Sequence, residues 1–563
     1  LTDKNGSLLS CISPNLSGDI KSDNDHFLTV PASVLDLKYN LLCRREFYLK
    51  ADNRYIRFSL SDKNDLLEAG LLYHKLTKRK HGLKIEITNF IPYDAGVEIM
   101  QVKVTNESKS PLDIIPTSFI PLYGRSEKNL RDHRHVSSLL NRVELLKYGI
   151  ILKPTMVFDE RKHLLNNTQY FSLGYENNGI APIGHFPSIE YFCGESSLDS
   201  PDAVYGNVKP VNKNSKVFDG KEAASAFRFR QRRLKPKEEV AYTLIMGISQ
   251  DRAFIDKILK RFDTLDKVEV ALDSTKEYWQ CYLNQAGLSF KDCVFNNWLL
   301  WVKLQPQLRR LFGCSFLPHF DYGKGGRGWR DLWQDALSLL LFEPDKTKEM
   351  VKHNFRGVRI DGSNATIITK DGSFLADRNR INRVWMDHGV WPYLTLKAYL
   401  NKTEDLSMLL KDEVYFRDNQ LKRSKEMDTN FCQRDYVLRD KTGRIYRGSI
   451  LEHVLVENLV QFFNVGEHNV IRLEGADWND GLDMAKDKGE SVAFSFMYAH
   501  NLDDICIYLE SLKRKTNKVK LLKEIKPLLD TLGEPVNYND YCAKQKRLGF
   551  YFDKTKEISG KRL

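Results

Sequence analysis

Residues 477–483 (DWNDGLD) are the group of side chains in this chain best suited to chemistry. They place three carboxylates and the indole of Trp478 on an Asn-Asp-Gly sequence that favours a tight turn. An indole packs on the C–H face of a sugar ring, and a carboxyl group can protonate a departing glycosidic oxygen. The pattern therefore favours a sugar-handling site. An ordinary loop with one buried Trp has the same composition and remains an alternative.

A second stretch, residues 328–337 (GWRDLWQDAL), combines a cation with carboxylates at the expected start of a helix. On a helix Asp331 and Asp335 share one face, with Arg330 nearby. A guanidinium and carboxylates together supply the donors and acceptors that vicinal sugar hydroxyls require. An internal ion pair at the helix start is the alternative interpretation.

A third stretch, residues 385–393 (WMDHGVWPY), again sets aromatic side chains beside a carboxylate, Asp387, and a histidine, His388. A single histidine in such a setting is more often a structural hydrogen-bond donor than a catalyst. We therefore assign no catalytic role to His388.

The glycine-rich residues 323–328 (GKGGRG) match the G-x-G-x-x-G spacing of dinucleotide-binding loops. That motif needs a buried strand before it and a βαβ unit around it. Residues 315–322 contain proline and charge instead, so we reject a nucleotide site.

The elements that must position these stretches fall into two kinds. Up to about residue 265 apolar and polar residues alternate, which predicts antiparallel strands packed as a large sandwich. The clearest examples are residues 83–90, 97–104 and a hairpin formed by 226–230 and 240–246 around the polar tip 235–239.

From about residue 250 the apolar residues recur at helical spacing, which predicts a helical toroid whose long loops carry function. Expected helices are 254–279, 297–304, 331–342, 390–400, 450–463 and 492–509. Ser449 and Glu452 form a candidate capping box at the fifth of these, and residues 549–552 read as a strand-like pair. The expected domains are a β-sandwich at 1–250, a helical linker at 251–290 and the helical domain at 291–563.

Composition excludes several classes of protein. The chain has 563 residues with 42% hydrophobic content, which suits two or three globular domains. Its net charge is +12, but the densest basic cluster, residues 228–237, alternates with apolar side chains, and no nucleic-acid motif occurs. No apolar run approaches the ~20 residues that span a bilayer. Nine scattered cysteines show no zinc spacing, so we expect no metal site and reduced thiols in the cytoplasm.

Taken in chain order, the three stretches resemble the inverting cellobiose and chitobiose phosphorylases, glycoside hydrolase family 94, and related β-oligoglucan phosphorylases. Residues 234–239, 451–453 and 466–468 also look like family segments, so the resemblance covers roughly residues 80–563. It implies a β-sandwich, a linker and an (α/α)6 barrel.

The resemblance also implies roles for individual residues. Asp480 is similar to the family's general acid, and Trp478 to the sugar platform beside it. Asp477 and Asp483 are assigned to turn structure. The residues expected to bind substrate share a position beside the sugar subsite, and they are Arg327, Arg330, Asp335, Trp478, Asp387 and Trp391.

The implied reaction is the phosphorolysis of β-linked glucosides with inversion, giving α-glucose 1-phosphate. Phosphate is already an anionic nucleophile, so one carboxylic acid is enough, without the base that inverting hydrolysis needs. A low-dielectric sugar pocket is expected to keep Asp480 protonated near neutral pH. The expected partners are a β-linked oligosaccharide and phosphate as co-substrate, without a further cofactor. A homodimer is also implied, although no interface can be identified.

The chain departs from the family pattern near its end. The family's phosphate-binding residues follow in further barrel helices, and no counterpart occurs before Leu563, so we expect a piece of a longer protein and leave the phosphate-binding residues unassigned. Two alternatives stay open. One is an inverting β-glucan hydrolase with Asp387 or Asp321 as base, and the other is a non-catalytic carbohydrate-binding remnant. Linkage specificity and substrate length are not fixed by the sequence.

Overall fold

The computed structural model describes residues 1–33, 35–39, 41–59, 62–157, 164–312, 327–369, 372–376, 383–433, 435–529 and 535–563. Asp321 and most of the glycine-rich loop lie outside these ranges. The described chain forms two compact units, one up to Cys293 and one from Val294 onward, and each is described separately.

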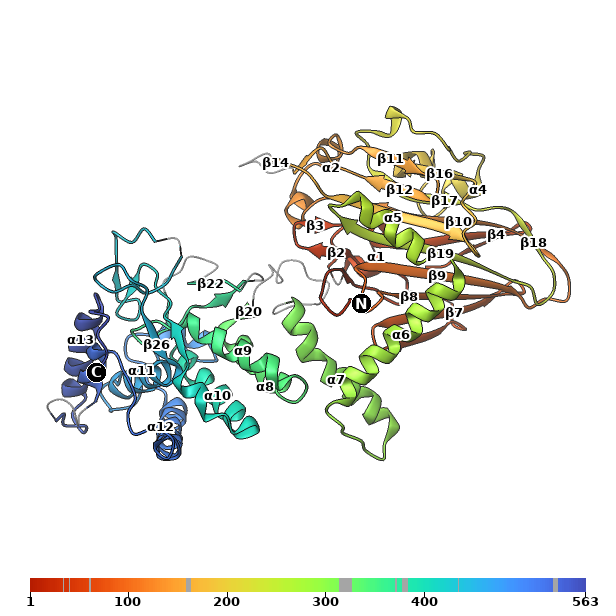
Figure 1. Ribbon diagram of the computed structural model, residues 1–563. Coiled ribbons are helices and arrows are strands. Elements are labelled where there is room, and N and C mark those ends of the chain that lie inside the picture. Colours follow the sequence, from red (N-terminus) through yellow and green to blue (C-terminus); the bar gives the residue numbers. More distant parts are fainter. Residues whose placement is uncertain are drawn as a thin grey trace. The chain divides into compact units, whose positions relative to one another are not determined.

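The first unit is an antiparallel β-sandwich, as the alternating sequence predicts (Figure 1). Its eight-stranded sheet runs, in spatial order, β11 (Val143–Leu146), β12 (Gly149–Leu152), β15 (Gln169–Glu176), β19 (Glu239–Ser249), β9 (Val97–Asn106), β8 (Leu83–Phe90), β7 (Tyr73–Lys80) and β6 (Leu66–Gly70). The six-stranded sheet runs β16 (Gly184–Ser188), β17 (Ala223–Arg228), β10 (Leu112–Leu122), β4 (Glu46–Ala51) and β5 (Arg54–Arg57), with β18 (Arg232–Leu234) beside β10.

Both faces of the larger sheet are covered. Successive side chains of a strand point to opposite faces, so neighbouring residues enter two different hydrophobic cores. Leu244 lies opposite Met100, and both belong to the core between the two sheets. The next pair, Ile245 opposite Ile99, belongs to a second core on the outer face. That core is completed by α5 (Arg252–Arg261) and α6 (Leu265–Asn284). The helices expected as a linker thus cover the sandwich.

The second unit is helical, with short strands between its helices. Its helices are α7 (Cys293–Phe312), α8 (Trp329–Leu339), α9 (Pro344–Asn354), α10 (Val390–Thr403), α11 (Ile450–Phe463), α12 (Val492–Lys513) and α13 (Tyr541–Thr555). One hydrophobic core joins α8 to α13, and α11 is buried along nearly its whole length. The predicted fold class, a β-sandwich followed by a helical domain, is confirmed.

Three local expectations were wrong. Residues 226–230 and 240–246 do not form a hairpin, because β17 pairs with β10 in the six-stranded sheet, whereas β19 pairs with β15 and β9 in the eight-stranded sheet. Ser449 does cap α11, since its Oγ accepts from the Glu452 backbone N–H, but the Glu452 carboxylate does not complete a capping box. It accepts instead from the hydroxyls of Tyr415 and Tyr446. Residues 549–552 lie in α13, not in a strand, because the buried side chains of this segment recur at helical spacing.

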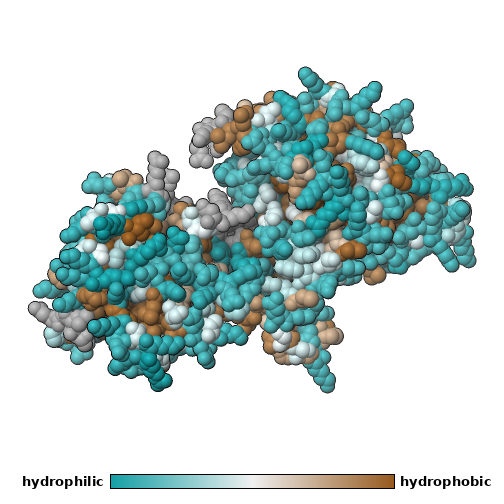
Figure 2. Space-filling model, in the orientation of Figure 1, coloured by the Kyte–Doolittle hydropathy of each residue, from teal (hydrophilic) through white to brown (hydrophobic). Residues whose placement is uncertain are grey.

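The surface is that of a protein rich in charge. The face shown in Figure 2 is mostly hydrophilic, with hydrophobic residues in scattered patches. No helix among the residues placed by the structure is long and apolar enough to cross a membrane. The eight cysteines within the described ranges are free thiols.

Candidate active site

The three stretches converge on the guanidinium of Arg330, near the start of α8. Its Nε and Nη2 donate to the two carboxylate oxygens of Asp387 at 2.7 and 3.0 Å. Nη2 also donates to the backbone carbonyl of Asp477 at 2.6 Å, and Nη1 lies 3.4 Å from Asp480 Oδ1. One side chain therefore ties together segments that are 150 positions apart in the sequence.

The carboxylate of Asp480 is bonded on one side and open on the other. Oδ1 accepts a hydrogen bond from the indole Nε1 of Trp385 at 2.9 Å and faces Arg330. Oδ2 has no hydrogen-bond partner within the described part of the chain. The side chain is 64% exposed, so the expected low-dielectric pocket around Asp480 is absent from this arrangement.

Trp385 is itself held in place from two sides. Its ring stacks on His388 with centroids 5.1 Å apart, and the guanidinium of Arg383 lies 4.6 Å from the Trp385 ring. Burial, together with the charge of Arg330, holds the pKa of His388 well below its usual value. The imidazole is therefore neutral, which agrees with the structural role expected for it.

Backbone pairing fixes the loop that carries Trp478 and Asp480 to the segment before α10. Met386 N–H donates to Ala476 O, and Gly475 N–H donates to Val384 O, each at 2.9 Å. A Cβ atom at position 475 would lie 2.6 Å from Val384 O, a contact that only glycine avoids. The two segments can approach this closely because residue 475 is Gly.

Two indoles form a candidate sugar platform beside Asp480. Trp478 is 55% exposed and meets Trp391 edge to face, with centroids 6.1 Å apart. The Arg330 guanidinium lies 5.2 Å from the Trp478 ring. An exposed indole next to a cation and a carboxylate offers both apolar and polar contacts to a sugar ring.

Asp387 lies behind Arg330 and is fully buried. Its Oδ2 also accepts from Trp391 Nε1 at 2.9 Å. Burial acts to lower the pKa of Arg330, but the ion pair with Asp387 outweighs it and raises that pKa. Asp387 therefore supports Arg330 and Trp391, and this placement gives it no surface for direct sugar contact.

Asp335 is not brought to this cluster. It makes no hydrogen bond or ion pair to Arg330, and pairs instead with Arg309 of α7 at 2.8 Å. Five helical positions separate the two side chains by about 140° around the axis, which explains why they diverge. Burial raises the pKa of Asp335 against the opposing effects of Arg309 and Arg327. Arg327 itself lies in β20 (Arg327–Gly328), paired with β21 (Ile367–Ile368).

Sequence reasoning missed two residues of the site. Trp385 stood in the third stretch, but its N–H could not be linked to Asp480 without the pairing of the two loops. Arg383 carries no local signal, although its Nε and Nη2 donate to Gly475 O at 3.1 and 3.0 Å. Among the residues that the structure describes, no group of three or more His, Cys, Asp or Glu side chains is arranged to hold a metal ion.

Comparisons with known proteins match both units. Residues 278–541 match the model of the Glycosyl hydrolase 94 superfamily, catalytic domain. Residues 61–265 match that of the Glycosyl hydrolase 94, supersandwich domain. The two matches agree with the order of the units, a β-sandwich and then a helical catalytic domain.

Individual relatives are distant. Solabiose phosphorylase of Paenibacillus borealis is 24% identical over 84% of this chain and 54% of that protein. N,N'-diacetylchitobiose phosphorylase of Vibrio furnissii is 21% identical over 78% of this chain and 52% of that protein. The chain thus spans about half the length of these relatives.

A solved bacterial glucoamylase in complex with acarbose covers 71% of this chain and 55% of its own, with 11% identity and a TM-score of 0.44. That likeness is too low to bear on this protein. The two family models together span most of the sequence and include every candidate residue described above. The chain therefore belongs to glycosyl hydrolase family 94.

Proposed function

We propose that this protein is a glycoside phosphorylase that cleaves β-linked glucosides or oligoglucans with inversion and releases α-glucose 1-phosphate. The observation that carries the proposal is Asp480, with one oxygen held by Trp385 and Arg330 and the other open beside the exposed Trp478. Membership of family 94 and the names of the relatives support the same reaction class.

The chemistry follows from this arrangement. The open Oδ2 of Asp480, when protonated, delivers its proton to the glycosidic oxygen. A phosphate oxygen attacks the anomeric carbon from the opposite face, the bond from that carbon to the glycosidic oxygen breaks, and Asp480 is left as a carboxylate. The N–H groups of Trp385 and Arg330 stabilise the charge that develops on Oδ1. One carboxyl group is sufficient, because phosphate needs no base.

The placement of Asp387 argues against the hydrolytic alternative. An inverting hydrolase needs a second carboxylate that can activate water. Asp387 is fully buried, and both its oxygens accept hydrogen bonds from Arg330. The other proposed base, Asp321, lies outside the described residues. The non-catalytic alternative gives no reason why one carboxylate oxygen of Asp480 should be held by hydrogen bonds while the other is left open.

The remaining parts of the proposal concern setting and assembly. We assign the chemistry to the helical unit, which holds every residue of the candidate site, and the β-linked oligosaccharide and phosphate are its partners. A cytoplasmic location suits the free thiols and a supply of phosphate. The homodimer implied by the family resemblance remains part of the proposal.

An assay with and without phosphate tests the proposed function. The protein is incubated with cellobiose or N,N'-diacetylchitobiose, and products are followed by phosphorus-31 and proton NMR. We expect an α-sugar 1-phosphate that forms only when phosphate is present. Free sugar released without phosphate would support the hydrolase, and binding without turnover would support the carbohydrate-binding remnant.

A further inference from the structure

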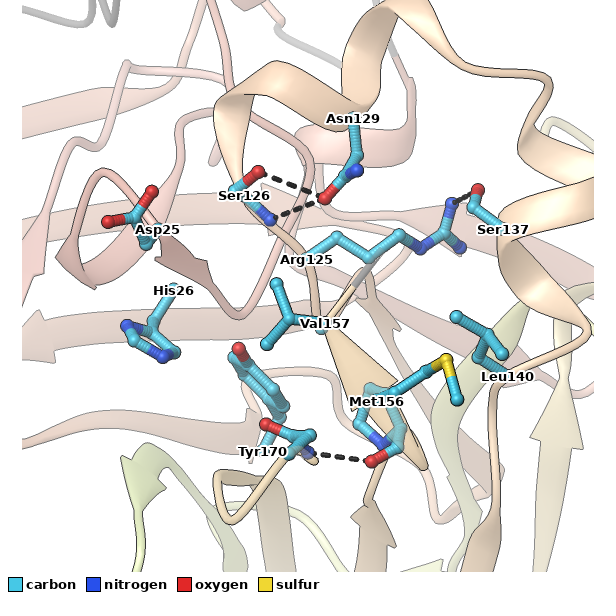
Figure 3. A pocket seen from close by; sticks show the side chains of 13 residues that line it. Asp25, His26, Arg125, Ser126, Asn129, Ser137, Leu140, Met156, Val157 and Tyr170 are labelled. Carbon is cyan, nitrogen blue, oxygen red and sulfur yellow. Dashed lines mark hydrogen bonds between the residues drawn. The ribbon is translucent and has the colours of Figure 1, made fainter. Parts of the chain in front are cut away.

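The sandwich unit contains a cleft, lined by polar and apolar side chains, that the proposed reaction does not use (Figure 3). An outer groove of about 660 Å³ adjoins an inner recess of about 20 Å³. The two cavities share lining residues, among them Asp25, His26, Ser126, Asn129 and Val157. The groove has the size of a small-molecule site, and the recess has room for about one water-sized group.

The hydroxyl of a tyrosine points into this cleft. Tyr170 is only 2% exposed, and its hydroxyl projects into the space between His26 and Val157 (Figure 3). That hydroxyl has no hydrogen-bond partner among the residues placed by the structure. Burial, with the nearby carboxylates of Asp23 and Asp25, raises the pKa of Tyr170, so the group remains a donor. The side chain is buried, but its hydroxyl opens onto the recess, where a ligand hydroxyl can accept its hydrogen bond.

A buried donor also lines the recess. Arg125 is 6% exposed, and its Nη1 and Nη2 donate to Ser137 Oγ at 2.6 Å and to Glu222 Oε1 at 2.7 Å. Its Nε has no hydrogen-bond partner in the described structure. Because Glu222 balances the charge of Arg125, the recess offers a hydrogen bond more than a net positive charge.

The outer groove combines balanced charge with apolar surface. Asp25 faces Lys128 at 3.8 Å on one side. Arg131 and Asp132 add one charge of each sign to the lining. Val157 and the exposed Leu164 and Leu165 line the same groove. A groove with balanced charges disfavours an ionic ligand. It suits a neutral ligand that has hydroxyl groups for the polar walls and a C–H face for the apolar ones.

We propose that this cleft is a second carbohydrate-binding site, which holds a neutral mono- or disaccharide without turning it over. One sugar hydroxyl enters the recess and bonds to Tyr170, and the ring lies in the groove against Val157 and Leu164. All the lining residues belong to the sandwich unit, whereas Asp480 belongs to the helical unit. The inference therefore does not depend on the proposed reaction.

Hydrogen–deuterium exchange of the whole protein locates the site. With millimolar cellobiose or glucose as the probe, we expect slower amide exchange in residues 124–129 and 164–170. Tyr170→Phe should weaken this binding about three- to tenfold, the effect of one neutral hydrogen bond. Tyr148→Phe is the matched control, since the Tyr148 hydroxyl bonds to Gly179 O outside the cleft.

Two further variants keep the test decisive. Asp25→Ala changes an exposed side chain of the cleft and should also weaken binding if Tyr170→Phe does not fold. Trp478→Ala removes the proposed catalytic platform and should leave protection in the sandwich unit unchanged. The proposal is overturned if sugar protects only the helical unit, if neither sugar protects the cleft, or if folded Tyr170→Phe and Asp25→Ala bind as the wild type does.

Discussion

At the scale of single residues, the candidate acid is defined by an asymmetry between its two oxygens. Oδ1 of Asp480 accepts from Trp385 and faces Arg330, while Oδ2 has no hydrogen-bond partner among the described residues. The proton to be transferred is therefore assigned to Oδ2. Trp385 acts through Asp480 and is a positioning residue, whose ring is in turn held by His388 and Arg383.

Trp385→Phe tests that role because it keeps the stacked ring and removes the N–H donor. A hydrogen bond to a charged group contributes about 1.5–3 kcal/mol, so we expect kcat to fall about ten- to a hundredfold. KM should change much less, because the sugar platform is intact. Steady-state kinetics measure both. Trp298→Phe, at an exposed position of α7, is the control, and equal losses in the two variants would contradict the assignment.

At the scale of elements, the site depends on a close approach of two loops and on the buried helix α11 behind them. Gly475 allows the loops to pair, and Glu457 of α11 is fully buried beneath the site. Its Oε1 accepts from Asn364 Nδ2 at 2.6 Å, whereas Oε2 has no hydrogen-bond partner in the part of the chain described. Both features carry measurable consequences.

Gly475→Ala should separate the two loops. The new Cβ would lie 2.6 Å from a backbone oxygen, which cannot move aside cheaply, so we expect a loss of about 1–3 kcal/mol in unfolding free energy. Displacement of Asp480 should also lower kcat by about tenfold or more. Urea titration and kinetics measure the two effects. Gly549→Ala in α13 is the control, since its Cβ would meet open space; matching losses there would refute the explanation.

Glu457 should make the protein less stable as pH rises. Burial raises the pKa of Glu457 well above 4.5, against the effects of Asn364 and Arg423. Its stabilising contribution is therefore full below about pH 4.5 and is lost as pH rises through the raised pKa, by up to about 1.4 kcal/mol per pH unit. Glu457→Gln should gain stability over the wild type across that window in urea titrations. A constant difference between the two proteins at all pH values would show that Glu457 is ionised in the fold.

At the scale of the whole molecule, the helices and strands could be predicted from the sequence, but the contacts between them could not. The alternation at residues 83–90 and the helical spacing at 450–463 gave β8 and α11 with the same bounds. Local pattern also singled out the three stretches that hold Arg330, Asp387, Trp478 and Asp480, and these residues do converge. It could not show that Asp335 pairs with Arg309 of α7 and not with Arg330, nor that Trp385 donates to Asp480. Both depend on contacts between segments far apart in the sequence.

Buried histidines in both units should make the whole protein sensitive to acid. Burial lowers the pKa values of His74, His185 and His453 to about 4, and that of His388 falls well below 6.5. The unfolded chain therefore takes up protons first. The stability these groups contribute is full above about pH 6.5 and is lost as pH falls toward 4, by up to about 1.4 kcal/mol per pH unit for each histidine. His453→Gln should therefore lose stability more slowly than the wild type as pH falls through this range, and parallel profiles of melting temperature against pH for the two proteins would contradict the burial of this ring.

The most direct test of the central claim is the phosphate-dependent release of sugar 1-phosphate by Asp480→Asn, compared with the wild type. Asn has the shape of Asp but cannot supply the proton, so we predict a loss of at least about a hundredfold, with an unchanged melting temperature. Asp503→Asn, at an exposed position of α12, should retain full activity. If Asp480→Asn releases sugar 1-phosphate at a rate close to that of the wild type, Asp480 is not the acid and the account of this site is wrong.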